Sequence, residues 1–154
     1  MVRSVPSAAQ RPAVRSHSEE ASLILQRTHF ILYVRDQQVS TRFYTQVLAV
    51  EPSLNVPGMT EFILPGNSIL GLMPEAGVRR LLGAALPDPG AARGTPRSEI
   101  YLVVEDPASY HRRALEAGAQ ELSSLSARDW GHHAAYSLDP DFHVLAFAKP
   151  SDDT

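Results

Sequence analysis

The sequence contains no cysteine, which excludes disulfide bonds, thiolate nucleophiles and thiolate metal ligands. It also lacks an apolar run long enough to span a membrane, and it lacks the apolar core of a signal peptide. No basic stripe stands out after the first residues, and the formal net charge of -3 gives no electrostatic basis for nucleic-acid binding. These absences predict a cytoplasmic protein that binds neither membranes nor nucleic acid.

The remaining composition fits one folded domain. Among 154 residues, 44% are hydrophobic and 20% are charged, which is ordinary for a globular protein. A chain of this length forms one domain or two small, similar halves that share a core. The first residues differ, because Arg3, Arg11 and Arg15 occur among serine, alanine and proline with no acid before Glu19. Residues 1–27 are predicted to be a disordered leader outside the fold, with a transit peptide as the alternative.

The stretch from Thr28 to Val50 changes from strand periodicity to helix periodicity. Apolar residues alternate at first, which predicts a strand with one buried face. Asp36 interrupts the strand and is expected to cap a helix, because its carboxylate accepts N–H bonds of the first turn. The helix-facing residues of the strand are Phe30, Leu32 and Val34. The opposite face then carries His29 and points away from the helix.

The same pattern occurs again later in the chain. Glu99 to Asp106 repeats His29 to Asp36, and Pro107 suits the first position of a second helix. Short strands are predicted after each helix, at 59–64, 68–73, 121–126, 132–138 and 143–148. The sequence therefore predicts an α+β fold of two tandem βαβββ modules with curled mixed sheets that enclose a cleft. The single domain spans 28–149, with modules at 28–74 and 98–149, a linker at 75–97 that holds a short helix near 78–85, and a tail at 150–154.

These features resemble the vicinal-oxygen-chelate superfamily, which includes glyoxalase I, extradiol dioxygenases, fosfomycin-resistance enzymes and bleomycin-resistance proteins. The matching segments are the strand and helix at 29–48, the Asp-Pro helix start at 106–118 and the hairpin region at 128–148. The resemblance implies paired modules around a U-shaped cleft and a homodimer.

Metal-dependent members of that superfamily hold a divalent ion with His and Glu side chains at four positions, so that two substrate oxygens complete its shell. The matching residues here are His29, Gly71, Glu99 and Ala146. Glycine and alanine carry no donor atom, so the resemblance implies the metal-free, bleomycin-resistance-like type with no cofactor and with space for a ligand at the two small residues. The alternative is a lactoylglutathione-lyase-like or dioxygenase-like enzyme, with a divalent metal on His29 and Glu99 and extra ligands such as His132.

The predicted partner is an aromatic or amphipathic small molecule, as in antibiotic-binding relatives, because aromatic side chains with polar tips alternate onto the cleft side. The predicted ligand-binding residues are His29, Tyr33, Gly71, Glu99, Tyr101, Trp130, Tyr136 and Ala146. Two interpretations of Glu99 stay open: it pairs with His29 across the modules, or it receives a cationic ligand group. His132 and His133 are adjacent on a strand and should therefore point to opposite faces.

The turn before the last strand departs from the superfamily, which usually has glycine where this chain has Phe142. A phenylalanine in the left-handed conformation costs about 1–2 kcal/mol. We therefore predict a turn of a different shape here. His143, which follows, is predicted to be an edge residue and not a ligand.

Overall fold

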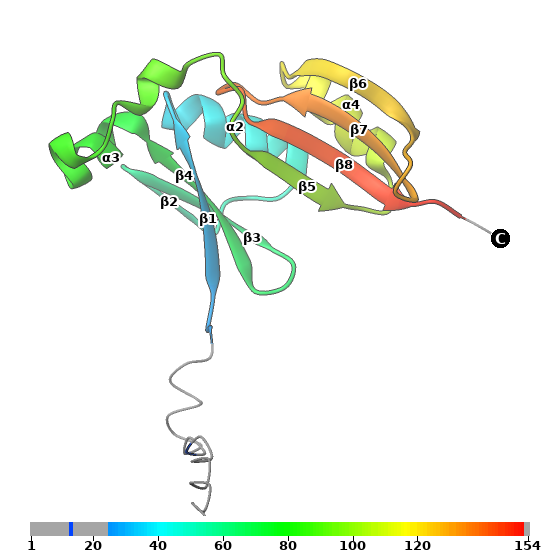
Figure 1. Cartoon of the computed structure of the whole chain (residues 1–154), viewed down its shortest axis with the longest axis horizontal. Helices are drawn as coiled ribbons and strands as arrows, with labels where there is room; N and C mark the ends of the chain where they lie inside the picture. Colours follow the sequence, from blue (N-terminus) through cyan, green and yellow to red (C-terminus); the bar gives the residue numbers. More distant parts are fainter. Residues whose placement is uncertain (1–12, 14–24, 153–154) are drawn as a thin grey trace, which may run out of the picture.

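The computed structural model describes residue 13 and residues 25–152, and it contains the two predicted βαβββ modules one after the other (Figure 1). The first module consists of β1 (Thr28–Val34), α2 (Gln37–Leu48), β2 (Leu54–Val56), β3 (Met59–Leu64) and β4 (Ser68–Pro74). The second consists of β5 (Glu99–Val103), α4 (Pro107–Glu116), β6 (Gln120–Ala127), β7 (His132–Leu138) and β8 (Val144–Pro150). The predicted disordered leader lies largely outside the described residues, as does the end of the tail.

The linker between the modules contains α3 (Glu75–Leu82) and two short 3-10 turns, η1 (Gly83–Ala85) and η2 (Pro89–Ala92). The helix predicted near 78–85 therefore begins three residues earlier, directly after β4. None of the helices among the described residues has the length and hydrophobicity that a membrane span requires.

Each module forms a four-stranded mixed sheet, in the orders β1-β4-β3-β2 and β5-β8-β7-β6. In both sheets the first strand pairs in parallel with the last, and the other neighbours are antiparallel. Gly71 pairs with Ile31, and Ala146 pairs with Tyr101. Ile31 lies two residues after His29, and Tyr101 lies two residues after Glu99, so Gly71 and Ala146 occupy equivalent places in the two sheets. This confirms the predicted alignment of the two halves.

Both main helices start at the aspartates that the sequence indicates. One carboxylate oxygen of Asp36 accepts hydrogen bonds from Gln38 N at 2.9 Å and Val39 N at 3.1 Å. Asp106 accepts from Ser109 N at 3.1 Å, and Pro107 takes the first turn of α4. These bonds satisfy N–H groups that have no partner within the helix.

The helices α2 and α4 pack side by side and bring the two sheets into one core. Phe43, Tyr44 and Val47 of α2 are buried together with Leu145 and Phe147 of β8. Each fully buried side chain of this size contributes about 1.5–3 kcal/mol. The helix faces of the sheets therefore supply the hydrophobic core, and their other faces stay outside it.

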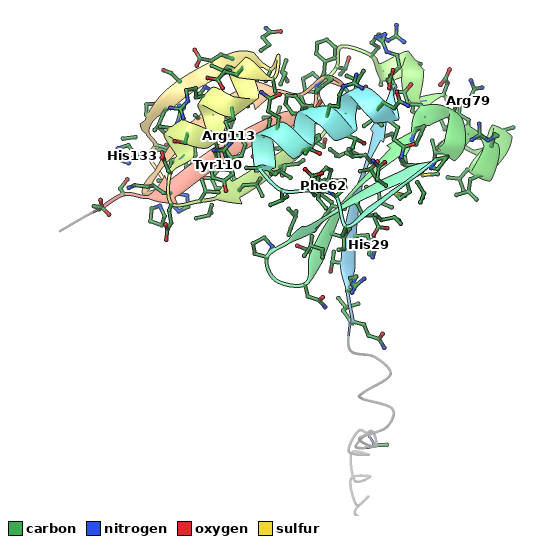
Figure 2. All side chains as sticks on the ribbon, turned by 180° about the vertical axis from the view of Figure 1, so that it is seen from behind. His29, Phe62, Arg79, Tyr110, Arg113 and His133 are labelled. Atoms are coloured by element: carbon green, nitrogen blue, oxygen red, sulfur yellow. The ribbon has the colours of Figure 1, made fainter. Side chains whose placement is uncertain are left out.

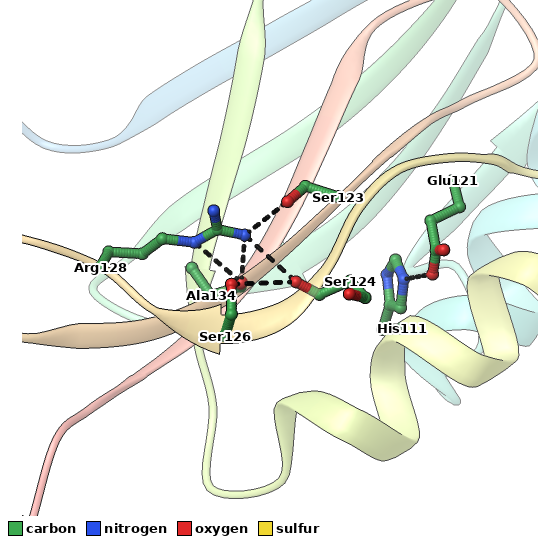
Figure 3. A network of polar contacts seen from close by, with 7 residues as sticks. All are labelled: His111, Glu121, Ser123, Ser124, Ser126, Arg128 and Ala134. Carbon is green, nitrogen blue, oxygen red and sulfur yellow. Dashed lines mark hydrogen bonds and ion pairs between the residues drawn. The ribbon is translucent and has the colours of Figure 1, made fainter.

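Two further contacts attach α4 to its surroundings. Arg113 donates from Nε to the carbonyl oxygen of Val47 at 3.1 Å and lies over the Tyr110 ring, 4.3 Å from its centre (Figure 2). His111 is buried, and its Nε2 lies 2.8 Å from Oε2 of Glu121 on β6 (Figure 3). The bond to Val47 joins the second module to the end of α2 in the first.

The turn between β7 and β8 corrects one prediction. Phe142 does adopt the left-handed conformation, with φ 66°, so the predicted change of turn shape is wrong. The reason is the buried Asp139, whose Oδ1 accepts from Asp141 N at 2.8 Å and from His143 N at 2.9 Å. Its Oδ2 accepts from the Tyr44 hydroxyl at 2.6 Å. Charge-assisted bonds of this kind offset the cost of the strained residue.

His143, predicted to be an edge residue and not a ligand, lies in this turn directly before β8 and is buried. Its Nδ1 lies 2.7 Å from Ser98 Oγ, and its Nε2 lies 3.2 Å from the Tyr33 carbonyl oxygen. Asp141 accepts from Arg35 N at 2.9 Å and from Ser40 Oγ at 3.1 Å. The turn of the second module is therefore bonded into the first module.

Candidate functional site

The edge strands β1 and β5 border a groove of about 590 Å³. Apolar side chains of β1, β4 and β5 form most of its wall, among them Ile31, Leu70 and Leu102. Its polar residues include Glu99 and Tyr101. The groove therefore combines an apolar wall with a few polar groups, which is the usual composition of a small-molecule site.

Polar and aromatic side chains continue from the groove across the second sheet on the side away from α4. This polar face consists of Glu99, Tyr101, Trp130, His132 and Tyr136. The register explains its shape, because Tyr101 and Tyr136 both pair with the buried Ala146 of β8, which lies between their strands. A methyl group at position 146 leaves room for the rings of the two neighbouring strands.

Hydrogen bonds join three members of the polar face. The Tyr101 hydroxyl lies 2.7 Å from Nδ1 of His132, and the two rings are stacked with their centres 5.9 Å apart. Trp130 donates from Nε1 to the same hydroxyl oxygen at 3.0 Å, although its side chain is 53% exposed. Tyr101 is therefore held by two different ring systems.

Arg128 supports Tyr136 from the loop side of the sheet. Its guanidinium carbon lies 5.2 Å from the centre of the Tyr136 ring, and its nitrogens donate to Ala134 O at 2.8 Å and Ser123 Oγ at 2.8 Å (Figure 3). The pKa of Tyr136 is raised, first by burial and then by Glu99 and Tyr101, while Arg128 opposes the rise. The negative charge of Glu99 therefore contributes to the environment of the Tyr136 hydroxyl.

The first sheet places His29 beside an acid that sequence reasoning missed. Nδ1 of His29 lies 3.9 Å from Oε1 of Glu61 on β3 (Figure 2 labels His29). Among the ion pairs of the described residues, His29 has this partner and not Glu99, so the pairing of His29 with Glu99 is not found. A partial signal lay in the strands predicted at 59–64 and 68–73, because a hairpin of these strands sets Glu61 opposite Gly71, although it does not place His29 beside them.

The two small residues do not open space as predicted. A Cβ added to Gly71 would lie 3.1 Å from Cγ1 of Ile31 and 3.3 Å from Sδ of Met59. Ala146 has 0% of its side chain exposed. Neighbouring side chains therefore fill the space at both positions, and the prediction of a ligand opening there is wrong.

The remaining predicted residues separate into two places. Glu99, Tyr101, Trp130 and Tyr136 belong to the polar face. Tyr33 lines a different, small cavity of about 20 Å³ with Arg35, Arg93 and Arg97, and so lies apart from the groove. His132 and His133 do point to opposite faces, since His133 bonds to Ser151 (Nδ1 to Oγ, 3.1 Å) while His132 bonds to Tyr101.

The positions expected to hold a divalent ion do not form a site within one chain. Among residue 13 and residues 25–152, no group of three His, Asp or Glu side chains is arranged to hold a metal. His29 has one acidic neighbour, and Gly71 and Ala146 offer no donor atom. The described residues of one chain therefore bring fewer donor atoms together here than a dedicated metal centre uses.

Comparison with known proteins gives a family profile that matches residues 26–147, described as the Glyoxalase/Bleomycin resistance protein/Dioxygenase superfamily. No curated protein matches the chain. Solved structures do match the chain.

A glyoxalase-related enzyme from Fulvimarina pelagi is similar with a TM-score of 0.69 and 23% identity, covering 82% of this chain and 88% of that one. A glyoxalase/bleomycin resistance protein/dioxygenase family enzyme from Burkholderia phytofirmans PsJN has a TM-score of 0.68 and 19% identity, covering 80% and 97%. Oxidase ChaP-H2 has a TM-score of 0.59 and 22% identity, covering 85% and 98%. At these identities the likeness establishes the fold.

Proposed function

Since the chain belongs to the Glyoxalase/Bleomycin resistance protein/Dioxygenase superfamily, we propose that it binds an aromatic or amphipathic small molecule without a catalytic metal. The ligand lies in the groove between β1 and β5 and reaches onto the polar face. Sequestration of such a compound, as in antibiotic resistance, is the activity that this proposal implies. The absence of cysteine fits a cytoplasmic location.

The groove itself is the observation that carries this proposal. Its volume of about 590 Å³ falls within the range of roughly 300–1,000 Å³ that is typical of small-molecule sites. Its wall is mainly apolar, and its polar residues are Ser68, Ser98, Glu99 and Tyr101, of which Glu99 carries a charge. A ligand with an apolar body and one polar end would therefore satisfy both parts of the groove.

Glu99 supports a positive charge at that polar end. Its carboxylate is exposed on the polar face, and its negative charge contributes to the raised pKa of Tyr136. A cationic group beside a carboxylate and aromatic faces is stabilised by both.

Calorimetric titration tests the proposal against glycopeptide antibiotics and against aromatic compounds that are cationic, neutral or anionic. We expect cationic aromatic compounds to bind, and we expect Glu99→Gln to lower their affinity about 10-fold. Glu51→Gln, at an exposed position after α2, is the matched control and should leave binding unchanged. If no compound in the panel produces heat, the binding proposal is refuted.

A second candidate is the metal-dependent lyase or dioxygenase, and the closeness of His29 and Glu61 favours it. In that case a second copy of the chain would have to supply further ligands. Metal analysis of protein purified without chelators decides between the two. A stoichiometric divalent metal that is lost in both His29→Gln and Glu61→Gln would replace the binding proposal.

We also propose that the protein is a homodimer. The first sheet exposes apolar side chains on the face that carries His29, namely Ile31, Leu54, Val56 and Ile63. The edge strands β1 and β5 additionally leave backbone groups free to pair. A second copy would cover this face, and light scattering after gel filtration should give twice the mass of 16.8 kDa. Ile63→Asp, at a side chain that is 68% exposed, should yield monomer.

A further inference from the structure

The Tyr101 hydroxyl has one partner whose role is fixed by its chemistry. Trp130 lies 3.0 Å away with its indole N–H, and an indole nitrogen donates but never accepts. The Tyr101 oxygen therefore accepts a hydrogen bond on that side. A phenol has one proton and two lone pairs, so one proton and one lone pair are left for other partners.

The second partner uses the proton. Nδ1 of His132 lies 2.7 Å from the Tyr101 oxygen, and a neutral imidazole accepts at the nitrogen that carries no proton. When Tyr101 donates to Nδ1, the His132 proton is on Nε2, and the Tyr101 oxygen keeps one lone pair. That lone pair is then the remaining hydrogen-bonding capacity of the hydroxyl.

The residues around this lone pair favour a ligand that donates a hydrogen bond and carries a positive charge. Glu99 is on the same strand and the same face as Tyr101, and a carboxylate only accepts hydrogen bonds. The pairing residues of β8 on this face are Val144, Ala146 and Ala148, which carry no charge. Arg128, a cation near this face, is bonded to Ala134 and Ser123 and lies over Tyr136.

We propose that Trp130 and His132 are positioning residues that fix the Tyr101 hydroxyl as a hydrogen-bond acceptor for an N–H group of the ligand, while the negative charge of Glu99 on the same face favours a protonated nitrogen. The ligand class is then a primary or secondary organic ammonium ion attached to an apolar body. This inference rests on the proposed small-molecule function and narrows it, because it requires N–H groups in addition to positive charge.

A matched series of probes separates charge from hydrogen bonding. The probes are 1-naphthylmethylammonium, its trimethylated quaternary form, the neutral 1-naphthylmethanol and the anionic 1-naphthoate. The quaternary ion keeps the charge and the ring but has no N–H to donate. We expect calorimetry to give the tightest binding for the primary ammonium, weaker binding for the quaternary ion and the weakest for the anion.

Variants then test the positioning role. Tyr101→Phe and His132→Phe should each lower the affinity for the primary ammonium about 10-fold and change the affinity for the quaternary ion less than threefold. His132→Asn should restore the wild-type preference, because its amide can accept from the Tyr101 hydroxyl at the place of Nδ1. If His132→Phe lowers the affinity for both cations equally, or leaves both affinities unchanged, the positioning role is overturned.

A measurement on the protein without ligand makes the inference independent of the binding assay. Nitrogen NMR of the histidine rings distinguishes a protonated from an unprotonated Nδ1, and we expect Nδ1 of His132 to be unprotonated at pH 7.5. A protonated Nδ1 would overturn the proposal even if the probes bind. If Nδ1 is unprotonated but no probe binds, the proposed function and the ligand class fail together, while the arrangement of Tyr101 stands.

Discussion

Replacement of Tyr44 by phenylalanine tests the link between the two modules. Tyr44 is fully buried on α2, and its hydroxyl donates to Asp139 of the second module at 2.6 Å. Asp139 is only 5% exposed, so water cannot replace the lost donor. A hydrogen bond to a charged group contributes about 1.5–3 kcal/mol. We therefore expect Tyr44→Phe to lower the free energy of unfolding by about 2 kcal/mol, or the melting temperature by about 4–8 °C.

The loss should depend on pH in a defined direction. The pKa of Asp139 is raised above its ordinary value of 3.8, first by burial, while His143 and the Tyr44 hydrogen bond oppose the rise. A raised folded-state pKa means that protonated Asp139 favours folding, and this contribution is lost as the pH rises from 3.8 through the folded-state pKa. Without the Tyr44 hydroxyl the pKa of Asp139 rises further. The destabilisation should therefore be larger at pH 7, where the carboxylate is charged, than at pH 4.

Urea unfolding followed by circular dichroism at both pH values measures the effect. Tyr110→Phe is the matched control, because Tyr110 packs against Phe147 and its hydroxyl has no hydrogen-bond partner among the described residues. Its loss should be small and independent of pH. A Tyr44→Phe variant that loses no more stability than this control, or loses more at pH 4 than at pH 7, would refute the reasoning.

Three further substitutions test other parts of the fold by urea unfolding. Gly71→Ala should destabilise by about 1–3 kcal/mol, because its Cβ would lie 3.1 Å from Ile31 Cγ1; unchanged stability would mean that the Ile31 and Met59 side chains shift without cost. Ala49→Gly should stabilise by about 0.5–1 kcal/mol, since Ala49 ends α2 at φ 56°, and a loss of stability would contradict this. Arg128→Lys should destabilise by about 1 kcal/mol, because an ammonium cannot reproduce the paired bonds to the Ala134 carbonyl; an unchanged unfolding midpoint would show that these bonds contribute nothing.

Local signals were sufficient to locate the starts of both main helices. The carboxylates of Asp36 and Asp106 cap helices where the sequence indicates, since a cap depends only on residues within one turn. The alternation from His29 and from Glu99 likewise assigns the faces of both first strands correctly. The repeat between these strands then predicts two sheets with the same strand order, which the register of Gly71 and Ala146 confirms.

Side-chain partners across strands were harder to predict. Glu61 was missed as the neighbour of His29, because that contact depends on how three strands are arranged side by side. The prediction that Phe142 would not adopt the left-handed conformation considered only the local backbone cost of that residue. The fold tolerates it because Asp139, bonded to Tyr44 from the other module, organises the turn.

The sequence by itself determined the two modules, their helix starts and the faces of their strands, because these depend on periodicity and on contacts within a few residues. Only the tertiary structure decided that the space at Gly71 and Ala146 is filled, and that Trp130 and His132 meet at the Tyr101 hydroxyl. The physical reason is that packing and hydrogen bonding between distant segments depend on side-chain volume and direction in three dimensions, which a linear pattern does not encode.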